Sequence, residues 1–141
     1  MMLNIEVLSP ENVVYRGEAD EVIAPTSNGQ IAIFPHHVSL LTKISEGELI
    51  VKSGKQTQYI AVMDGFLQVR KDFITVLADY AIQSEDIQMH KAEEAKKRAE
   101  KLLEERVGQK DFAIIEADLR RSLLELKVAQ KRRRVASIQH K

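Results

Sequence analysis

The stretch Gly29–Thr42 reads Gly-Gln-Ile-Ala-Ile-Phe-Pro-His-His-Val-Ser-Leu-Leu-Thr and predicts a strand, a corner and a second strand. Ile31 and Ile33 alternate with their neighbours at the two-residue period of a pleated strand. Pro35 lacks the amide hydrogen that a strand donates, so the ladder must stop there and the chain must turn near His36. We therefore expect a β domain organised around a corner whose side chains point outward.

Two adjacent histidines, His36 and His37, invite comparison with a metal site at this corner. Neighbouring residues of an extended chain point to opposite faces, so this pair cannot easily bind one ion together. The chain has no cysteine, and its other histidines, His90 and His140, lie in a different kind of sequence. We expect no metal and no catalytic residue, with one imidazole bonding the turn backbone and the other facing solvent or a partner.

The two halves of the chain carry opposite charge, although the net charge of the 141 residues is zero. Residues 1–86 hold 6 Lys or Arg and 12 Asp or Glu, which gives −6, and residues 87–141 hold 15 and 9, which gives +6. The C-terminal half is therefore expected to meet an acidic surface on another protein, a nucleic acid or the N-terminal half itself. No run approaches the ~20 apolar residues of a membrane span, so membrane association is expected only through a partner.

Short apolar runs separated by turn residues predict an antiparallel β-sandwich or barrel over about residues 1–82. Ser53–Gln56 and the pair Asp64-Gly65 both have the composition of hairpin turns, and Lys71-Asp72 separates the last two strands. Gly54-Lys55 is not a phosphate-binding loop, because Leu49 stands where the first glycine is needed and Gln56 where Ser or Thr is needed.

The hydrophobic period changes to that of a helix after Ser84-Glu85-Asp86, where Ser84 or Asp86 could cap the first free amides. Gly108 is expected to end this helix, and Asp111 to cap a second, antiparallel helix. Each helix should be about 20 residues and roughly 30 Å long. Their apolar stripes comprise Ala92, Ala95, Ala99, Leu102 and Leu103, then Phe112, Ile115, Leu119, Leu123, Leu126, Val128 and Ala129.

The first stripe is mostly alanine, and burying alanine removes little apolar area from water. The contact between the helices should therefore be shallow, which favours a movable arm, although a hairpin docked permanently on the sandwich is the equal alternative. The basic run Lys131–Arg134 resembles a nucleic-acid footprint, but no aromatic residues surround it for stacking. A solvated face or protein-binding surface is favoured, with no nucleic-acid partner.

The order of these motifs resembles the epsilon subunit of rotary F-type ATP synthase over nearly the entire chain. Gly29–Leu41 is similar to the family's Gly-Glu-Leu-Gly-Ile-Leu-Pro-Gly-His-Ala-Pro-Leu corner, and Phe66–Val69 and Thr75–Asp79 match its later strands. Gln30 and His36 depart from the acid and the glycine that are usual at those positions, and Ala32 replaces another glycine. These departures concern the details of rotor contact.

The resemblance implies an N-terminal antiparallel β-sandwich of about ten strands over residues 1–84, seated on the rotor, and a regulatory antiparallel α-helical hairpin over residues 85–141. It implies a non-catalytic central-stalk subunit that couples the gamma shaft to the ring of c subunits. The hairpin would inhibit ATP hydrolysis by touching the alpha and beta subunits. The expected location is peripheral, at the cytoplasmic face of the bacterial plasma membrane, with the plastid thylakoid as the alternative.

Rotor contact is expected at the corner, through Gly29, Gln30, Pro35 and His37. The regulatory role of the hairpin is expected to fall on its basic residues, whose charge suits acidic loops. These residues are Arg120, Arg121, Lys127, Lys131, Arg132, Arg133 and Arg134.

Some family members bind ATP through an Ile/Leu-Asp-x-x-Arg-Ala motif, which here reads Ile87-Gln88-Met89-His90-Lys91-Ala92. Glutamine replaces the acid, and lysine replaces an arginine whose planar fork can bind phosphate with two hydrogen bonds. Leu123 and Lys127 fall where two further arginines are expected. We therefore expect no cofactor and at most weak ATP binding. The candidate residues for it are Ile87, Lys91, Ala92 and Arg98.

Two other functions remain open from the residues alone. One is a stand-alone adaptor whose basic hairpin binds an unrelated acidic protein, and the other is an RNA-binding accessory protein. Co-purification with gamma, alpha and beta subunits would favour the rotor subunit. A steep salt dependence of RNA affinity would instead favour the RNA-binding accessory protein.

Overall fold

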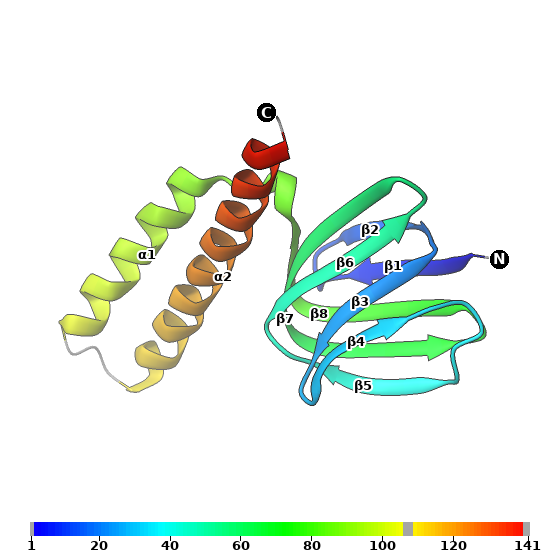
Figure 1. The fold of residues 1–141 in the computed structure, drawn as a ribbon. Coiled ribbons are helices and arrows are strands. Elements are labelled where there is room, and N and C mark those ends of the chain that lie inside the picture. The colour runs from blue at the N-terminus through cyan, green and yellow to red at the C-terminus, as the bar shows by residue number, and fades with distance from the viewer. Residues whose placement is uncertain (1, 106–108, 140–141) are drawn as a thin grey trace. The chain divides into compact units, whose positions relative to one another are not determined.

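The computed structural model describes residues 2–105 and 109–139, and Figure 1 shows a β-rich part followed by two helices. The chain divides into two compact units, Met1–Gln83 and Ser84–Lys141.

The first unit is the predicted sandwich, and its sheet is mostly antiparallel. The strand order is β2-β1-β8-β7-β5-β3-β4, with β6 paired to β3 and β7, and β1 runs parallel to β8. The strands are β1 (Leu3–Leu8), β2 (Val13–Ala19), β3 (Glu21–Thr26), β4 (Gly29–Ile33), β5 (Leu40–Ile44), β6 (Gly47–Ser53), β7 (Gln56–Arg70) and β8 (Phe73–Gln83). There are eight described strands against about ten expected, because β7 and β8 continue for 15 and 11 residues.

Strand β7 changes its pairing partner halfway along. Its first half pairs with β6, and its second half pairs with β5. The change occurs at Asp64, whose φ of 52° interrupts the pleat, and at Gly65. A Cβ on Gly65 would overlap the carbonyl oxygen of Leu77 and lie 2.7 Å from the Cα of Ala78. The predicted hairpin turn at Asp64-Gly65 is therefore wrong, and this pair instead lets one continuous strand bend close to β8.

The core consists of side chains that alternate inward along the strands. Leu3, Val22, Ile33, Leu49 and Ile60 have no exposed surface. The predicted hairpin at Gly54-Lys55 is confirmed, because Ser53 pairs with Gln56 across that two-residue turn.

The second unit begins with a short 3-10 helix, η1 (Ser84–Asp86), followed by α1 (Met89–Glu104) and α2 (Gln109–Gln139). The N-cap of α1 is Gln88, without a side-chain capping bond, so the prediction of a cap at Ser84 or Asp86 is wrong. Asp111 lies inside the first turn of α2 instead of capping it, and the predicted stop at Gly108 lies outside the described residues.

The two helices pack along one another as a hairpin, and their lengths differ from expectation. At 1.5 Å per residue, α1 with 16 residues spans about 24 Å and α2 with 31 residues about 46 Å. No helix among the described residues is long and apolar enough to cross a membrane.

Candidate functional site

The corner, residues 34–39, connects β4 to β5 and presents exposed apolar side chains. Phe34 is 52% exposed and Val38 is 76% exposed. His37 donates its backbone amide to the carbonyl oxygen of Phe34 at 3.2 Å, and its Nδ1 lies 2.7 Å from the carbonyl oxygen of Val38. One imidazole therefore bonds the turn backbone, as predicted, while the His36 side chain is exposed.

The four predicted rotor-contact residues lie at the two ends of β4 rather than in one cluster. Gly29, with φ of 107°, and Gln30 begin this strand, and Pro35 and His37 follow its end. A five-residue strand spans about 17 Å. Because β4 ends the strand order, one of its edges pairs with no strand among the described residues, and this edge and the corner form a continuous exposed border.

A second exposed surface of the sandwich, the apolar face, consists of Leu41, Phe66, Phe73 and Leu77. Phe66 is paired with Leu77 across β7 and β8, and both are more than half exposed. A hollow of about 570 Å³ lies against this pair and is also lined by Leu8 and Lys43. This surface was not among the predicted sites, although apolar residues occupy both alternating positions in β7 and β8, a pattern typical of strands covered on both faces.

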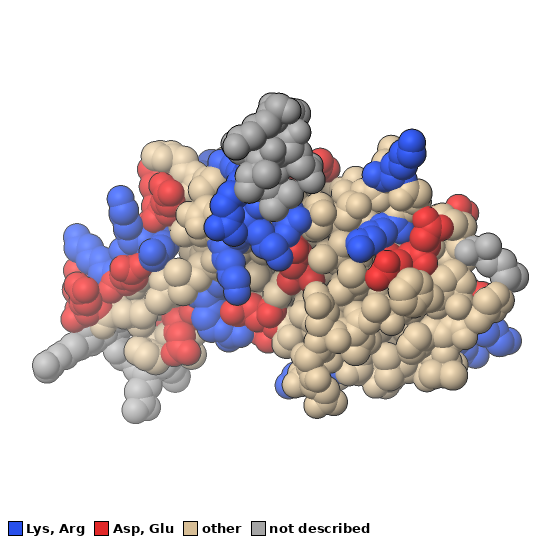
Figure 2. All heavy atoms as spheres, in the orientation of Figure 1, with Lys and Arg blue, Asp and Glu red and all other residues tan. Residues whose placement is uncertain are grey.

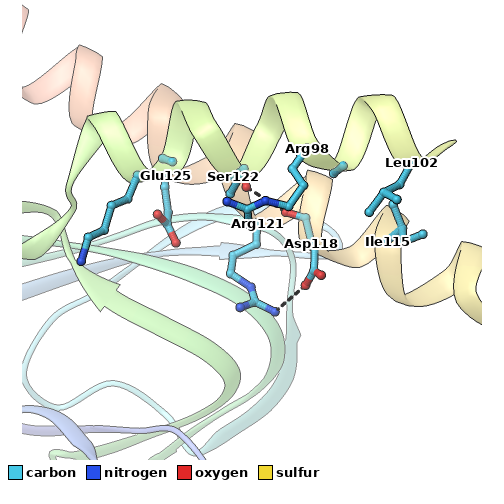
Figure 3. A pocket seen from close by; sticks show the side chains of 11 residues that line it. Arg98, Leu102, Ile115, Asp118, Arg121, Ser122 and Glu125 are labelled. Carbon is cyan, nitrogen blue, oxygen red and sulfur yellow. Dashed lines mark hydrogen bonds and ion pairs between the residues drawn. The ribbon is translucent and has the colours of Figure 1, made fainter. Parts of the chain in front are cut away.

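The hairpin holds a groove of about 350 Å³ between α1 and α2 (Figure 3). Three of the nucleotide candidates, Lys91, Ala92 and Arg98, line it, whereas Ile87 is buried and does not. Arg98 extends across the groove toward α2. The structure thus brings together the α1 part of the predicted site.

The α2 side of this groove differs from the sequence expectation. Leu123 and Lys127 line a different hollow of about 420 Å³, and the α2 cation in the groove is Arg121. Arg121 forms an ion pair with Asp118 at 3.1 Å, and Ser122 donates its hydroxyl to the carbonyl oxygen of Asp118 at 3.0 Å.

The lining of the groove nearly balances in charge. Its cations are Lys91, Arg98 and Arg121, and its carboxylates are Asp118 and Glu125, which leaves one net positive charge. With only one net positive charge, the lining offers little electrostatic attraction to a triphosphate, which carries several negative charges.

The basic residues of α2 are distributed around the helix instead of forming one stripe. Figure 2 shows Lys and Arg side chains gathered over the later part of α2. Lys127, Lys131 and Arg134 line the second hollow together with Lys96 of α1, which was not among the predicted residues. Arg120, Arg132 and Arg133 line neither of the two hollows between the helices. Among the described residues, no three His, Asp or Glu side chains are placed to hold a metal ion.

Two family models together match most of the chain. Residues 2–84 match the ATP synthase Delta/Epsilon chain beta-sandwich domain, and residues 85–130 match the Delta/Epsilon chain long alpha-helix domain. An ATP synthase epsilon chain of Dehalococcoides mccartyi strain BAV1 is 43% identical over 133 residues, covering 94% of this chain and 95% of that protein. One of Acidithiobacillus ferridurans is 38% identical over 133 residues, covering 94% of each chain.

Solved structures share the fold at low sequence identity. A chain in the Euglena gracilis mitochondrial ATP synthase OSCP/F1/c-ring structure has a TM-score of 0.64 at 14% identity, with 96% of this chain and 81% of that chain covered. A chain in the Tetrahymena thermophila mitochondrial ATP synthase central stalk/c-ring structure has a TM-score of 0.51 at 11% identity, covering 62% and 71%. On the family models and the identity to curated relatives, the chain belongs to the ATP synthase epsilon chain family.

Proposed function

We propose that this chain is a non-catalytic rotor subunit of the central stalk of a proton-translocating F-type ATP synthase. The observation that carries the proposal is that one sandwich exposes two surfaces of different character, the apolar face and the border formed by β4 and the corner. A subunit that transmits motion between two partners needs two such surfaces on one rigid body. Family membership identifies the partners as the gamma shaft and the c-ring.

The apolar face is assigned to gamma, because a large exposed apolar surface is stabilised when a partner covers it. Phe66 and Leu77 form its centre, and Lys43 at its edge offers a charge for orientation. The border is assigned to the c-ring, through Gly29, Gln30, Pro35 and His37, because its exposed groups are polar backbone and mixed side chains suited to loops.

The hairpin, residues 85–141, is assigned the inhibition of ATP hydrolysis through contact with the alpha and beta subunits. Its α1 face toward α2 consists largely of alanines, such as Ala92, Ala95 and Ala99, so little apolar area holds the helices together. Such a pair separates at low cost. Its cations then reach acidic partner loops, because α2 carries them on several sides.

This function places the protein peripherally at the cytoplasmic face of a bacterial plasma membrane, with a plastid thylakoid as the alternative host. Contact with the membrane comes through the complex. The residues 1–84 form the rotor-seated domain in this proposal.

Co-purification of the tagged full chain tests the assignment of the apolar face. Leu77→Asp, at a position 53% exposed, should abolish recovery of gamma together with alpha and beta, because a carboxylate would be buried in an apolar contact. Phe112→Asp is the matched control, since Phe112 is similarly exposed but lies on α2. If the wild-type chain recovers none of these subunits, the rotor assignment is wrong and the adaptor hypothesis gains support.

Cysteine cross-linking tests the border, and the chain has no native cysteine to interfere. Gln30→Cys should cross-link to cysteines placed in the c-ring loops. Glu18→Cys, also exposed but on β2 at the other end of the strand order, should not. Cross-linking at Glu18 but not at Gln30 would contradict the assignment.

A further inference from the structure

The corner depends for its shape on a residue 36 positions away in the chain. The His36 amide donates to Oδ1 of Asp72 at 2.6 Å, and the His36 Nδ1 lies 4.0 Å from Oδ2 of the same carboxylate. Asp72 lies in the turn between β7 and β8, so this contact ties the corner to a different part of the sandwich.

His36 needs such a contact because its backbone is in a left-handed conformation. Its φ is 68°, a region that residues with a Cβ rarely adopt. A conformation of this kind persists only where neighbouring groups hold it. A carboxylate that accepts the amide hydrogen provides a stronger hold than a neutral acceptor.

Asp72 is itself well anchored. It occupies, with Lys71, the two-residue connection from β7 to β8, and both have positive φ. Its carbonyl oxygen accepts the amide hydrogen of Asn4 in β1 at 2.8 Å. Its side chain is 25% exposed, against 68% for His36. The carboxylate therefore moves with the sheet and not with the corner.

We propose that Asp72 is a positioning residue that fixes the corner, and with it the exposed Phe34 and Val38 and the half-buried His37, in the shape that meets the partner subunit. The inference rests on the proposed rotor contact of the border. A corner that is already fixed loses less conformational freedom on binding, and it transmits displacement of the sheet directly. Asp72 contributes this fixed shape of the corner without touching the partner subunit.

Amide hydrogen exchange of the full chain tests the hold on the corner. Asp72→Ala should speed exchange of the His36 amide about tenfold or more, since bonds to charged groups are among the strongest in proteins. Asp72→Asn keeps an acceptor oxygen and should restore most of the protection. Lys71→Ala is the matched control in the same turn and should leave the His36 amide unchanged.

Cross-linking of Val38→Cys to the c-ring loops tests the positioning role in the assembled complex. Adding Asp72→Ala should lower the cross-linking rate about tenfold, and Asp72→Asn should recover it. Lys71→Ala also places alanine at a residue of positive φ in the same turn, so it controls for a general loss of sandwich stability and should leave the cross-linking rate unchanged. Unchanged exchange or unchanged cross-linking with Asp72→Ala would each overturn the proposal, as would an equal fall of the cross-linking rate with Lys71→Ala. If Val38→Cys alone gives no cross-link, the rotor contact fails, and the exchange result then decides separately whether Asp72 holds the corner.

Discussion

Replacing Gly65 with alanine should destabilise the sandwich strongly. The added Cβ would overlap the carbonyl oxygen of Leu77 and lie 2.7 Å from the Cα of Ala78 and 2.9 Å from the carbonyl carbon of Leu77. All three are backbone atoms of β8, which cannot rotate away as a side chain can. Relief therefore requires β7 and β8 to separate at the point where β7 changes partner from β6 to β5.

The expected loss is about 3 kcal/mol, at the upper end of the usual cost of overpacking, because the overlap involves fixed backbone. A unit of this size is stable by roughly 4 to 12 kcal/mol, so the variant loses a large share of its stability. The midpoint of thermal unfolding should fall by about 12 °C or more.

Tyrosine fluorescence during urea unfolding measures this change selectively. The chain has no tryptophan, and its three tyrosines, Tyr15, Tyr59 and Tyr80, all belong to the sandwich unit. Gly17→Ala in β2 is the matched control, because its Cβ would approach only the end of the Tyr15 side chain, at 3.0 Å. That variant should stay within about 1 kcal/mol of the wild type. A Gly65→Ala loss below about 0.5 kcal/mol would refute the close approach of β7 to β8.

The remaining predictions concern the hairpin. Deleting residues from Asp86 onward should leave the sandwich folded and the complex coupled while raising ATP hydrolysis, measured as phosphate release; unchanged hydrolysis would make the hairpin a fixed element. Alanine at Lys127, Lys131 and Arg134 should reproduce much of that rise, and alanine at Lys101 of α1 should not. Inhibition should also weaken with salt, because exposed charges are screened within about 8 Å at physiological ionic strength. Calorimetry with the isolated chain should find ATP affinity no tighter than the millimolar range, about −4 kcal/mol, and micromolar binding would show that the groove cations outweigh its carboxylates.

Local patterns in the sequence determined the elements and their classes. The alternation around Ile31 and Ile33, the proline after them and the Gly54-Lys55 turn each act over a few residues, and the structure has the corresponding strand, corner and hairpin. The change to a helical period after residue 84 likewise predicted helices, and the structure has two there. Such features can be read from the chain because their causes, side-chain period and backbone conformation, lie within the segment itself.

Tertiary contacts decided the features on which the proposed sites depend. Asp64-Gly65 has the composition of a hairpin turn, but pairing with β8 on one side and with β6 and β5 on the other keeps β7 continuous. Arg121 shares the groove with Arg98 because of how the two helices are rotated against each other.

The contact between Asp72 and His36 was also decided by tertiary structure, because the two residues are 36 positions apart in the chain. The residues at the corner indicated that the chain turns there, but the carboxylate that holds the turn comes from a hairpin formed much later in the sequence. A single sequence encodes which residues prefer a strand or a helix. Which distant groups come within hydrogen-bonding distance depends on the register and packing of the whole sheet, because those positions are set by many contacts together.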